Sequence, residues 1–147
     1  MNRPIVLRLG LFVSLVAMAA SVAGQAVTPP CTAAVCPVPV KVAPQTSTSP
    51  CHALVSPKVS VANGVQEIHW RIGTAGFRFD NTNGIRILNS AGHFTPLPSA
   101  SGQEFNLKFN GQGQGLTYEY ELNIVPVEGG ASCQGPAPTA RPRIKNE

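Results

Sequence analysis

The stretch Gln66-Glu67-Ile68-His69-Trp70-Arg71-Ile72 is the clearest structural signal in the chain. Ile68, Trp70 and Ile72 alternate with charged or polar residues, which is the period of two that an extended backbone with one buried face imposes. Every aromatic residue after the first dozen positions lies between Trp70 and Tyr120, so the material for a hydrophobic core is concentrated on this strand and its successors. We therefore predict a fold organised around a half-buried strand at 66–72.

The first 23 residues have the composition of a secretory signal peptide. Two arginines precede an uncharged apolar run from Leu9 to Ala20, and Ser21-Val22-Ala23 offers small residues to signal peptidase. A retained membrane anchor is the alternative, because about 20 apolar residues span a bilayer, but the Pro29-Pro30 pair weakens it. We predict a signal peptide at 1–23, a periplasmic or secreted protein, and no membrane association after cleavage.

Cleavage of this leader changes the length and charge of the chain. Of 147 residues 124 would remain, and the loss of two arginines from eleven basic residues leaves nine against seven acidic ones. A chain of this length buries one modest core and forms one domain. The small net charge, with aromatic residues on the core side rather than among the basic residues, argues against nucleic acid as a partner.

Residues 24–52 form a proline-rich arm or linker. Proline fixes φ and lacks a backbone N–H, so such a segment favours extended conformations and avoids the centre of a sheet. Within this segment, however, Val38, Val40 and Val42 would face one side of an extended chain, and Pro37 and Pro39 the other. This alternation fits an edge strand that packs against the domain. We predict a semi-ordered arm at 24–52, with an edge strand as the alternative, and a folded domain at 53–147.

A β-hairpin is predicted where this domain begins. Asn63-Gly64 is the commonest signal for a two-residue type I′ turn. With that turn Val59 faces Ile68 on the neighbouring strand, and Val61 shares the buried face with Trp70. Turn chemistry and hydrophobic pattern thus agree on one register, since a slip of one residue would send the apolar set to water.

Further strand-like runs follow, separated by turn residues. Apolar and polar residues alternate most cleanly at 116–124, and the same period recurs at 77–79, 85–87 and 105–109, with no helical period after the leader. Short strands with Gly-rich turns indicate two packed sheets. The predicted fold class is all-β, a small antiparallel β-sandwich of immunoglobulin-like architecture that follows a signal-peptide helix and a proline-rich arm.

Four cysteines remain after cleavage: Cys31, Cys36, Cys51 and Cys133. An even number in an exported chain predicts disulfides, and four thiols allow three pairings. We favour Cys51 with Cys133, which ties the start of the domain to its end, and Cys31 with Cys36 as a short local loop. A metal site of Cys31, Cys36, Cys51 and His52 is the alternative. Its spacing matches no zinc pattern, and thiolates compete poorly with oxidation outside the cytosol, so we predict no metal.

The chain predicts neither an enzyme nor a cofactor. Asp80 is the only aspartate and lies in a turn. Four glutamates have solvent-facing positions on strands: Glu67, Glu104, Glu119 and Glu121. No two carboxylates are placed for general acid and base roles, and no Ser or Cys is framed as a nucleophile. His69 occupies a wet face and lacks the partners that a catalytic base needs.

Three arginines have outward positions on successive strands: Arg71, Arg78 and Arg86. Neighbouring strands would bring their guanidinium groups together, and Arg141, Arg143 and Lys145 add positive charge near the end of the chain. Because guanidinium groups bind phosphate and carboxylate, the pattern predicts a face for an anionic envelope component or an acidic partner. The competing interpretation, which we favour from sequence alone, is an ordinary solvated face on which Glu67, Glu119 and Glu121 balance the arginines.

A set of motifs spans about half of the chain, from Ile68 to Asn146. They are Trp70, Gly76-Phe77-Arg78-Phe79, Asn83-Gly84-Ile85, Phe105, Tyr118-Glu119-Tyr120, Cys133 and Pro142-Arg143-Ile144-Lys145-Asn146. Together they resemble a pattern in small, uncharacterised exported β-sandwich proteins of Gram-negative bacteria. The resemblance implies export and a β fold and implies no activity; the arm with Cys31 and Cys36 has no counterpart in it.

Two classes of function are compatible with these features. The first is an exported interaction or structural module that recruits a protein partner through an exposed edge strand or its loops, since unpaired backbone groups accept a partner strand. The second is a small secreted hydrolase or inhibitor-like effector with a site built by loops around His93 and Asn81 to Asn83. A cleft that joins His93 to an acid or a serine would favour the second class, and a flat, filled sandwich would favour the first.

Overall fold

The computed structural model describes residues 31–47, 50–110 and 114–147. The predicted signal peptide and the first residues of the arm lie outside this range. The described chain is all-β, as predicted, and within it no helix is long and apolar enough to cross a membrane. Its elements are β1 (Val35–Ala43), β2 (His52–Val55), β3 (Lys58–Val61), β4 (Glu67–Ile72), β5 (Phe77–Phe79), β6 (Ile85–Ile87), β7 (Phe94–Leu97), β8 (Glu104–Phe109), β9 (Thr117–Leu122), β10 (Ile124–Pro126), the 3-10 turn η1 (Pro138–Ala140) and β11 (Arg143–Asn146).

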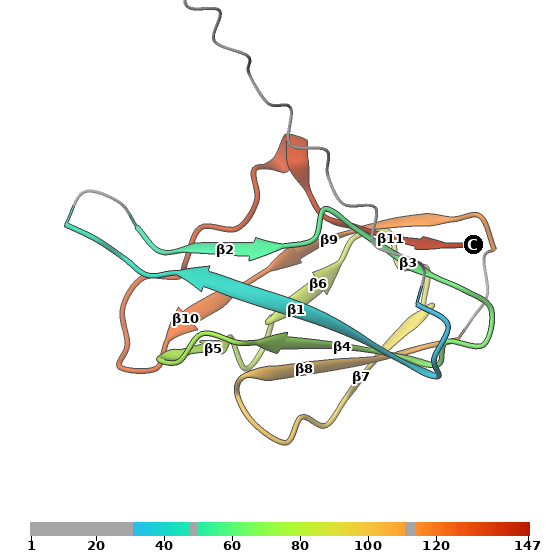
Figure 1. The fold of residues 1–147 in the computed structure, drawn as a ribbon, viewed down its shortest axis with the longest axis horizontal. Coiled ribbons are helices and arrows are strands. Elements are labelled where there is room, and N and C mark those ends of the chain that lie inside the picture. The colour runs from blue at the N-terminus through green and yellow to red at the C-terminus, as the bar shows by residue number, and fades with distance from the viewer. Residues whose placement is uncertain (1–30, 48–49, 111–113) are drawn as a thin grey trace, which may run out of the picture.

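The strands form three sheets, and the two larger ones pack face to face (Figure 1). The first sheet has five strands in the order β2-β1-β4-β8-β7, and the second has four in the order β3-β11-β9-β6. The third sheet has two strands, β5 and β10, and β10 follows β9 after a single residue. The predicted antiparallel pattern is wrong at two places, because β1 runs parallel to β4 and β3 runs parallel to β11.

The strand at the centre of the prediction is also at the centre of the fold. β4 lies in the middle of the first sheet, and Ile68, Trp70 and Ile72 are buried on its inner face, as the alternation predicted. The Trp70 ring meets the ring of Tyr120 from the facing sheet edge-on, with 5.4 Å between ring centroids. Such pairs contribute roughly 0.5–1.5 kcal/mol beyond the area they bury. This contact joins the two sheets at the core.

The proline-rich segment is not the edge strand that its composition suggested. β1 lies inside the first sheet, between β2 and β4. The carbonyl of Val40 accepts the N–H of Gly73 at 2.9 Å, so even-numbered residues of β1 direct their backbone groups toward β4. The backbone groups of Pro37 and Pro39 point to the other side of β1, toward β2. β2 pairs with β1 only from Val40 onward. The N–H groups that these prolines lack therefore cost no hydrogen bond between strands. The prolines also keep another chain from pairing with this unpaired stretch of β1.

The predicted hairpin between β3 and β4 does not form. A turn is present, with the Val65 N–H donating to the Ala62 carbonyl at 3.3 Å, but β3 pairs with β11 and β4 pairs with β1 and β8. A type I′ turn needs positive φ at both central residues, and here Gly64 has a φ of 97° while Asn63 is not in that region. The turn therefore carries the chain from one sheet to the other, and Val61 packs into the core from the facing side.

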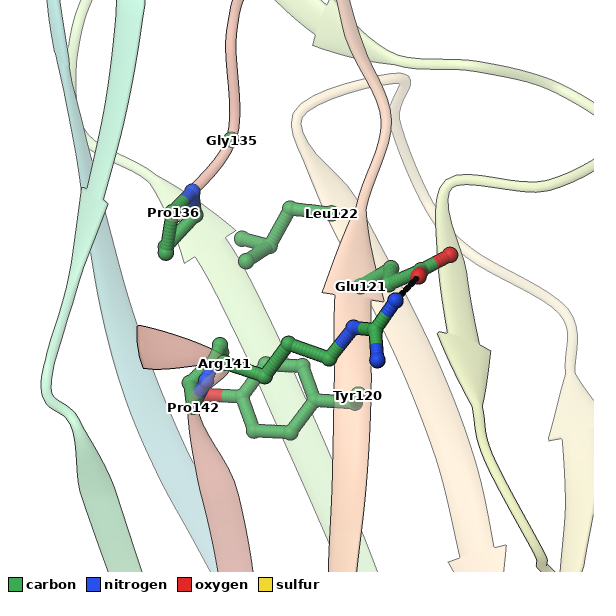
Figure 2. A pocket seen from close by; sticks show the side chains of 7 residues that line it. All are labelled: Tyr120, Glu121, Leu122, Gly135, Pro136, Arg141 and Pro142. Carbon is green, nitrogen blue, oxygen red and sulfur yellow. Dashed lines mark ion pairs between the residues drawn. The ribbon is translucent and has the colours of Figure 1, made fainter. Parts of the chain in front are cut away.

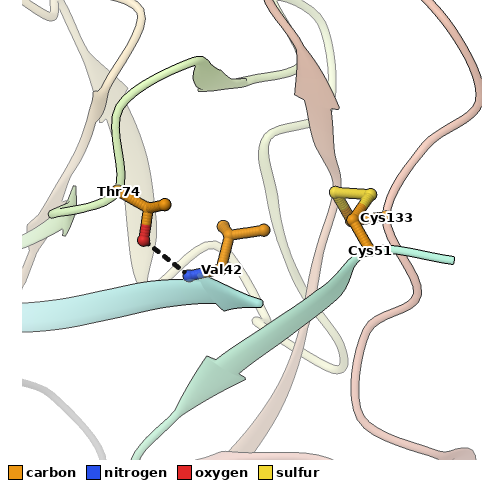
Figure 3. Close-up of a disulfide and its surroundings, with 4 residues drawn as sticks. All are labelled: Val42, Cys51, Thr74 and Cys133. Carbon is orange, nitrogen blue, oxygen red and sulfur yellow. Dashed lines mark hydrogen bonds between the residues drawn. A yellow bond between two sulfur atoms is a disulfide. The ribbon is translucent and has the colours of Figure 1, made fainter. Parts of the chain in front are cut away.

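Cys51 and Cys133 form a disulfide, as predicted (Figure 3). Cys51 precedes β2 in the first sheet, whereas the Cys133 N–H donates to the carbonyl of Ile124 in β10 at 2.8 Å. The next residue, Gln134, donates its N–H to the Cys51 carbonyl at 2.8 Å. The bond therefore lies at a corner where the two sheets meet, and backbone hydrogen bonds continue across the same corner.

A second corner joins the sheets through the residues before β1. The Cys31 N–H donates to the carbonyl of Ser60 in β3 at 2.8 Å, and the Ala34 carbonyl accepts the N–H of Gln66, just before β4, at 2.8 Å. The predicted bond between Cys31 and Cys36 is not formed in the structure, where both residues are thiols. Cys31 belongs to the corner, whereas Cys36 is buried on the inner face of β1.

Tyr120 makes the stability of the core sensitive to alkaline pH. Burial raises the pKa of Tyr120 from 10.0 to about 12, and interaction with the Trp70 indole opposes the rise in part. Because the pKa in the folded state exceeds that of the unfolded chain, the associated stabilisation is complete below pH 10 and is lost as the pH rises through 12. We expect the free energy of unfolding to fall by up to about 2.5 kcal/mol over this window.

Urea unfolding followed by far-UV circular dichroism, at several pH values, measures this effect. Cys36, whose pKa burial also raises to about 12, acts with the same sign, so the informative quantity is the difference between the wild type and Tyr120→Phe. The variant should lose the Tyr120 share of the pH dependence. Identical slopes for the two proteins would show that the hydroxyl of Tyr120 is not the group responsible.

Candidate functional site

The three arginines predicted to form one face lie apart. Arg71 is on β4 in the first sheet, where its Nε is 3.8 Å from a carboxylate oxygen of Glu104. Arg78 is on β5 and donates a hydrogen bond to the Asn81 side chain at 3.0 Å. Arg86 is on β6 in the four-stranded sheet. The prediction of a shared face is therefore wrong, because outward positions in two packed sheets point to opposite sides of the molecule.

The structure instead gathers five charged side chains on the outer face of the second sheet. We call them the Arg–Glu ladder: Arg86, Glu119, Glu121, Arg141 and Arg143. The alternation of β9 directs Glu119 and Glu121 outward, β6 places Arg86 opposite Glu121, and β11 places Arg143 opposite Glu119. Arg141 follows η1 and reaches the same carboxylates from the loop before β11.

The contacts of the ladder run in a chain from one edge of the sheet toward the other. Arg86 donates its Nε to Glu121 at 3.1 Å, and an Nη of Arg141 lies 2.9 Å from the other oxygen of Glu121. The second Nη of Arg141 lies 3.9 Å from Glu119, which Arg143 contacts at 3.2 Å. Each carboxylate is thus shared by two guanidinium groups. The contacts at 2.9 to 3.2 Å have the lengths of charge-assisted hydrogen bonds, whereas the 3.9 Å contact between Arg141 and Glu119 is an ion pair without a hydrogen bond.

The ladder carries an excess of positive charge. Three guanidinium groups face two carboxylates, and the hydrogen bond from Arg86, with the charges of Arg86 and Arg141, holds the pKa of Glu121 below its usual range. Glu121 therefore stays ionised, and the ladder as a whole keeps one net positive charge. Lys58 and Lys145, which both contact Glu147, at 3.4 and 3.3 Å, add one more on the same face.

Two adjoining recesses open beside the ladder. One, of about 200 Å³, is lined by Tyr120, Glu121, Leu122, Gly135, Pro136, Arg141 and Pro142 (Figure 2). The other, of about 350 Å³, is lined by Asn83, Arg86, Glu121, Leu122 and Asn123. Because Glu121 and Leu122 belong to both, we treat them as one feature, the Glu121 groove. Figure 2 shows the Arg141 side chain extended toward Glu121 in the smaller recess. Arg86 lines the larger one.

The loops named for a hydrolytic or inhibitory site do not converge. His93 contacts the hydroxyl of Tyr118. Asn81 lines a different recess, of about 430 Å³, whose described walls come from 79–82 and 96–105 and do not include His93. Asp80 beside it accepts the backbone N–H groups of Thr82 and Asn83 at 2.9 and 3.0 Å, and these bonds lower its pKa. Asp80 thus builds a turn.

Cysteine and histidine do not assemble a metal site in the described part of the chain. Cys51 is held in its disulfide, and the described residues contain no group of three or more His, Cys, Asp or Glu side chains that could hold an ion. The structure therefore does not bring together the four residues of the alternative metal site, Cys31, Cys36, Cys51 and His52.

Comparison with known proteins finds no matching family model, no similar curated protein and no similar solved structure. The structure itself defines an all-β protein of two packed sheets with one disulfide at a corner between them. The sequence pattern included all three arginines of the Arg–Glu ladder among its basic residues. It assigned Arg86 to the wrong neighbours, because only strand order brings Arg86 to Glu121 and Arg141.

Proposed function

We propose that the protein is an exported interaction module that binds an anionic component of the cell envelope through the Glu121 groove. The signal peptide at 1–23, a periplasmic or secreted location and an immunoglobulin-like sandwich are part of this proposal. Disulfides are characteristic of oxidising compartments, and Cys51–Cys133 supports export on that ground. The role is one of binding rather than of catalysis.

The single observation that carries the proposal is the position of two arginines on either side of Glu121. Arg86 and Arg141 each contribute to one half of the groove and both contact Glu121. The side chain of Arg86 is 63% exposed, so part of its guanidinium group is open to a ligand. Guanidinium groups pair with phosphate or carboxylate in a planar, bidentate manner. A phosphate or carboxylate group of an envelope glycan or lipid is the chemistry that fits.

Strand addition to a sheet edge is less well supported by the structure. The edge strands are β2 and β7 in the five-stranded sheet and β3 and β6 in the four-stranded sheet. β7 contains Pro96, and β6 has only three residues. A proline on an edge strand and a very short edge strand are the devices by which proteins avoid pairing with another chain.

Retention on a phosphate-bearing matrix tests the proposed binding. We expect Arg86→Gln/Arg141→Gln to bind about tenfold more weakly than the wild type, because it loses charge-assisted hydrogen bonds worth about 1.5 kcal/mol or more. The matched control is Arg71→Gln/Lys108→Gln, which removes the same charge from exposed residues of the other sheet. Equal loss of retention in the two double variants would show that net charge, and not the groove, determines binding.

Glu121→Gln separates a binding site from a purely structural ion-pair ladder. Removing this carboxylate frees both guanidinium groups for an external anion, so we expect stronger retention than in the wild type. A Glu121→Gln protein that is folded by circular dichroism and binds more weakly than the wild type would contradict the proposal, because the arginines would then be serving the fold alone.

A further inference from the structure

Cys31 and Cys36 occupy a corner of the sandwich that corresponds to the corner of Cys51 and Cys133. Besides its bond to Ser60, Cys31 accepts the N–H of Ala62 through its carbonyl at 2.9 Å, so it adds a residue to the edge of β3 in the second sheet. Cys36 lies opposite Ile68 in the first sheet and is 2% exposed. The two cysteines thus come from different sheets although five positions separate them in sequence.

The two cysteines lie at the same corner. Cys31 packs against the hydrophobic core that contains Cys36, and its side chain contributes, after burial, to the raised pKa of the Cys36 thiol. This corner is at the beginning of β1, whereas Cys51 and Cys133 lie near its other end, where β2 pairs with the last residues of β1. One sulfur pair therefore lies near each end of β1.

We propose that Cys31 and Cys36 are a second crosslinking site, which oxidation closes into a disulfide that locks the start of β1 between the two sheets. The geometry carries the inference, because both side chains are already positioned at one corner and no rearrangement of strand order is needed. The physical role follows from the topology. β1 pairs only with β4 over Val35 to Pro39, and its pairing with β2 begins at Val40, so its N-terminal half is held by hydrogen bonds on one side only.

The reaction is a thiol–disulfide exchange with an external disulfide, either a small molecule or an oxidoreductase. The half-buried Cys31 is the accessible nucleophile, and its thiolate attacks one sulfur of the oxidant and releases the other as a thiolate. Cys36 then attacks Sγ of Cys31 in the mixed disulfide and displaces the second oxidant sulfur. Two protons leave the cysteines, and the two electrons reduce the oxidant to two thiols. Burial raises the pKa of the Cys36 thiol to about 12, so this second step should be slow in the folded protein and faster during folding.

Oxidative refolding tests the proposal directly. The reduced, unfolded chain is refolded with oxidised and reduced glutathione, alkylated under denaturing conditions and digested with trypsin. No lysine or arginine lies between Cys31 and Cys36, so their bond appears within one peptide as the loss of two hydrogen atoms and of both alkyl groups. We expect this product together with Cys51–Cys133. Alkylated Cys31 and Cys36 beside an intact Cys51–Cys133 bond would overturn the proposal, and so would pairing between the two sets.

Hydrogen exchange tests the locking of β1. Cys31→Ala leaves the buried Cys36 side chain in the core and removes the crosslink, while Cys51–Cys133 is retained. Compared with the oxidised wild type, we expect faster amide exchange at Cys36 to Val40 and a melting temperature lower by roughly 5 °C. Val35→Ala, at an exposed position of the same strand, is the matched control and should change neither value. Unchanged exchange in Cys31→Ala would show that the bond, even if formed, does not hold the strand.

Discussion

The variant Cys51→Ala/Cys133→Ala is expected to lose about 4 kcal/mol of its free energy of unfolding. The two residues are separated by 82 positions, so the bond closes a loop that contains most of the described domain. In the loop-entropy model the stabilisation grows with the logarithm of loop length, which makes this bond worth more than a local one. The bond also fastens the corner where Gln134 hydrogen-bonds to Cys51 and Ala53, at the start of β2, and Cys133 hydrogen-bonds to Ile124 of β10.

Chemical denaturation in urea, with and without reductant, measures this loss. The reduced wild type serves as the control for the alanine substitutions, because it loses the bond and keeps the cysteine side chains. The two should agree to within about 1 kcal/mol if truncation at this corner leaves little cavity. A double variant that unfolds within about 1 kcal/mol of the oxidised wild type would mean that backbone contacts at the corner suffice without the crosslink.

Gly84→Ala is expected to cost about 3 kcal/mol, the upper end of the range for overpacking a core. A Cβ at Gly84 would lie 2.7 Å from Cδ2 of Phe105, 2.7 Å from Cβ of Phe79 and 3.0 Å from the carbonyl oxygen of Asp80. Two of these atoms belong to or adjoin the backbone and cannot move aside by a rotamer change. Phe79 and Phe105 also pack edge-to-face on one another, with 5.9 Å between centroids, so displacing one disturbs the other.

The matched control for this substitution is Gly73→Ala. The nearest atom to a Cβ at Gly73 is a carbonyl oxygen at 3.9 Å, and its φ is not in the left-handed region. Alanine there should be neutral or stabilising by a few tenths of a kcal/mol, because it narrows the unfolded ensemble. Equilibrium unfolding of both variants decides the matter: equal stabilities would show that the turn at Gly84 yields to the added methyl group.

The buried residues of the core were predictable from sequence wherever a strand has one face exposed to solvent. The alternation of Ile68, Trp70 and Ile72 identified the buried side of β4, and the run that became β9 buried Tyr118 and Tyr120 in the same way. A period of two reports which side of a strand is apolar, and burial follows from that alone. It does not report which strand lies beside it, so the hairpin predicted between β3 and β4 failed although the apolar residues of both strands face the core.

The Arg–Glu ladder could be predicted only in its parts. Glu119 and Glu121 were identified as solvent-facing. Arg86 was grouped with Arg71 and Arg78, and Arg141 and Arg143 were named only as positive charge near the end of the chain. Their pairing depends on β9 lying between β6 and β11, and β11 follows β9 only after β10, η1 and the loops between them. Contacts of this kind join residues twenty or more positions apart, and local pattern carries no information about them.

The amino-acid sequence by itself determined the strand periods, the apolar faces and the presence of a long-range sulfur crosslink, because each depends on residue type and spacing along an extended chain. The tertiary structure alone decided that a proline-bearing strand lies inside a sheet and that Arg71 and Arg86 belong to opposite sheets. The physical reason is that strand order is chosen by the burial of all faces together. A proline is acceptable in an inner strand wherever its missing N–H points to a place without a partner, and only the assembled sheet defines that place.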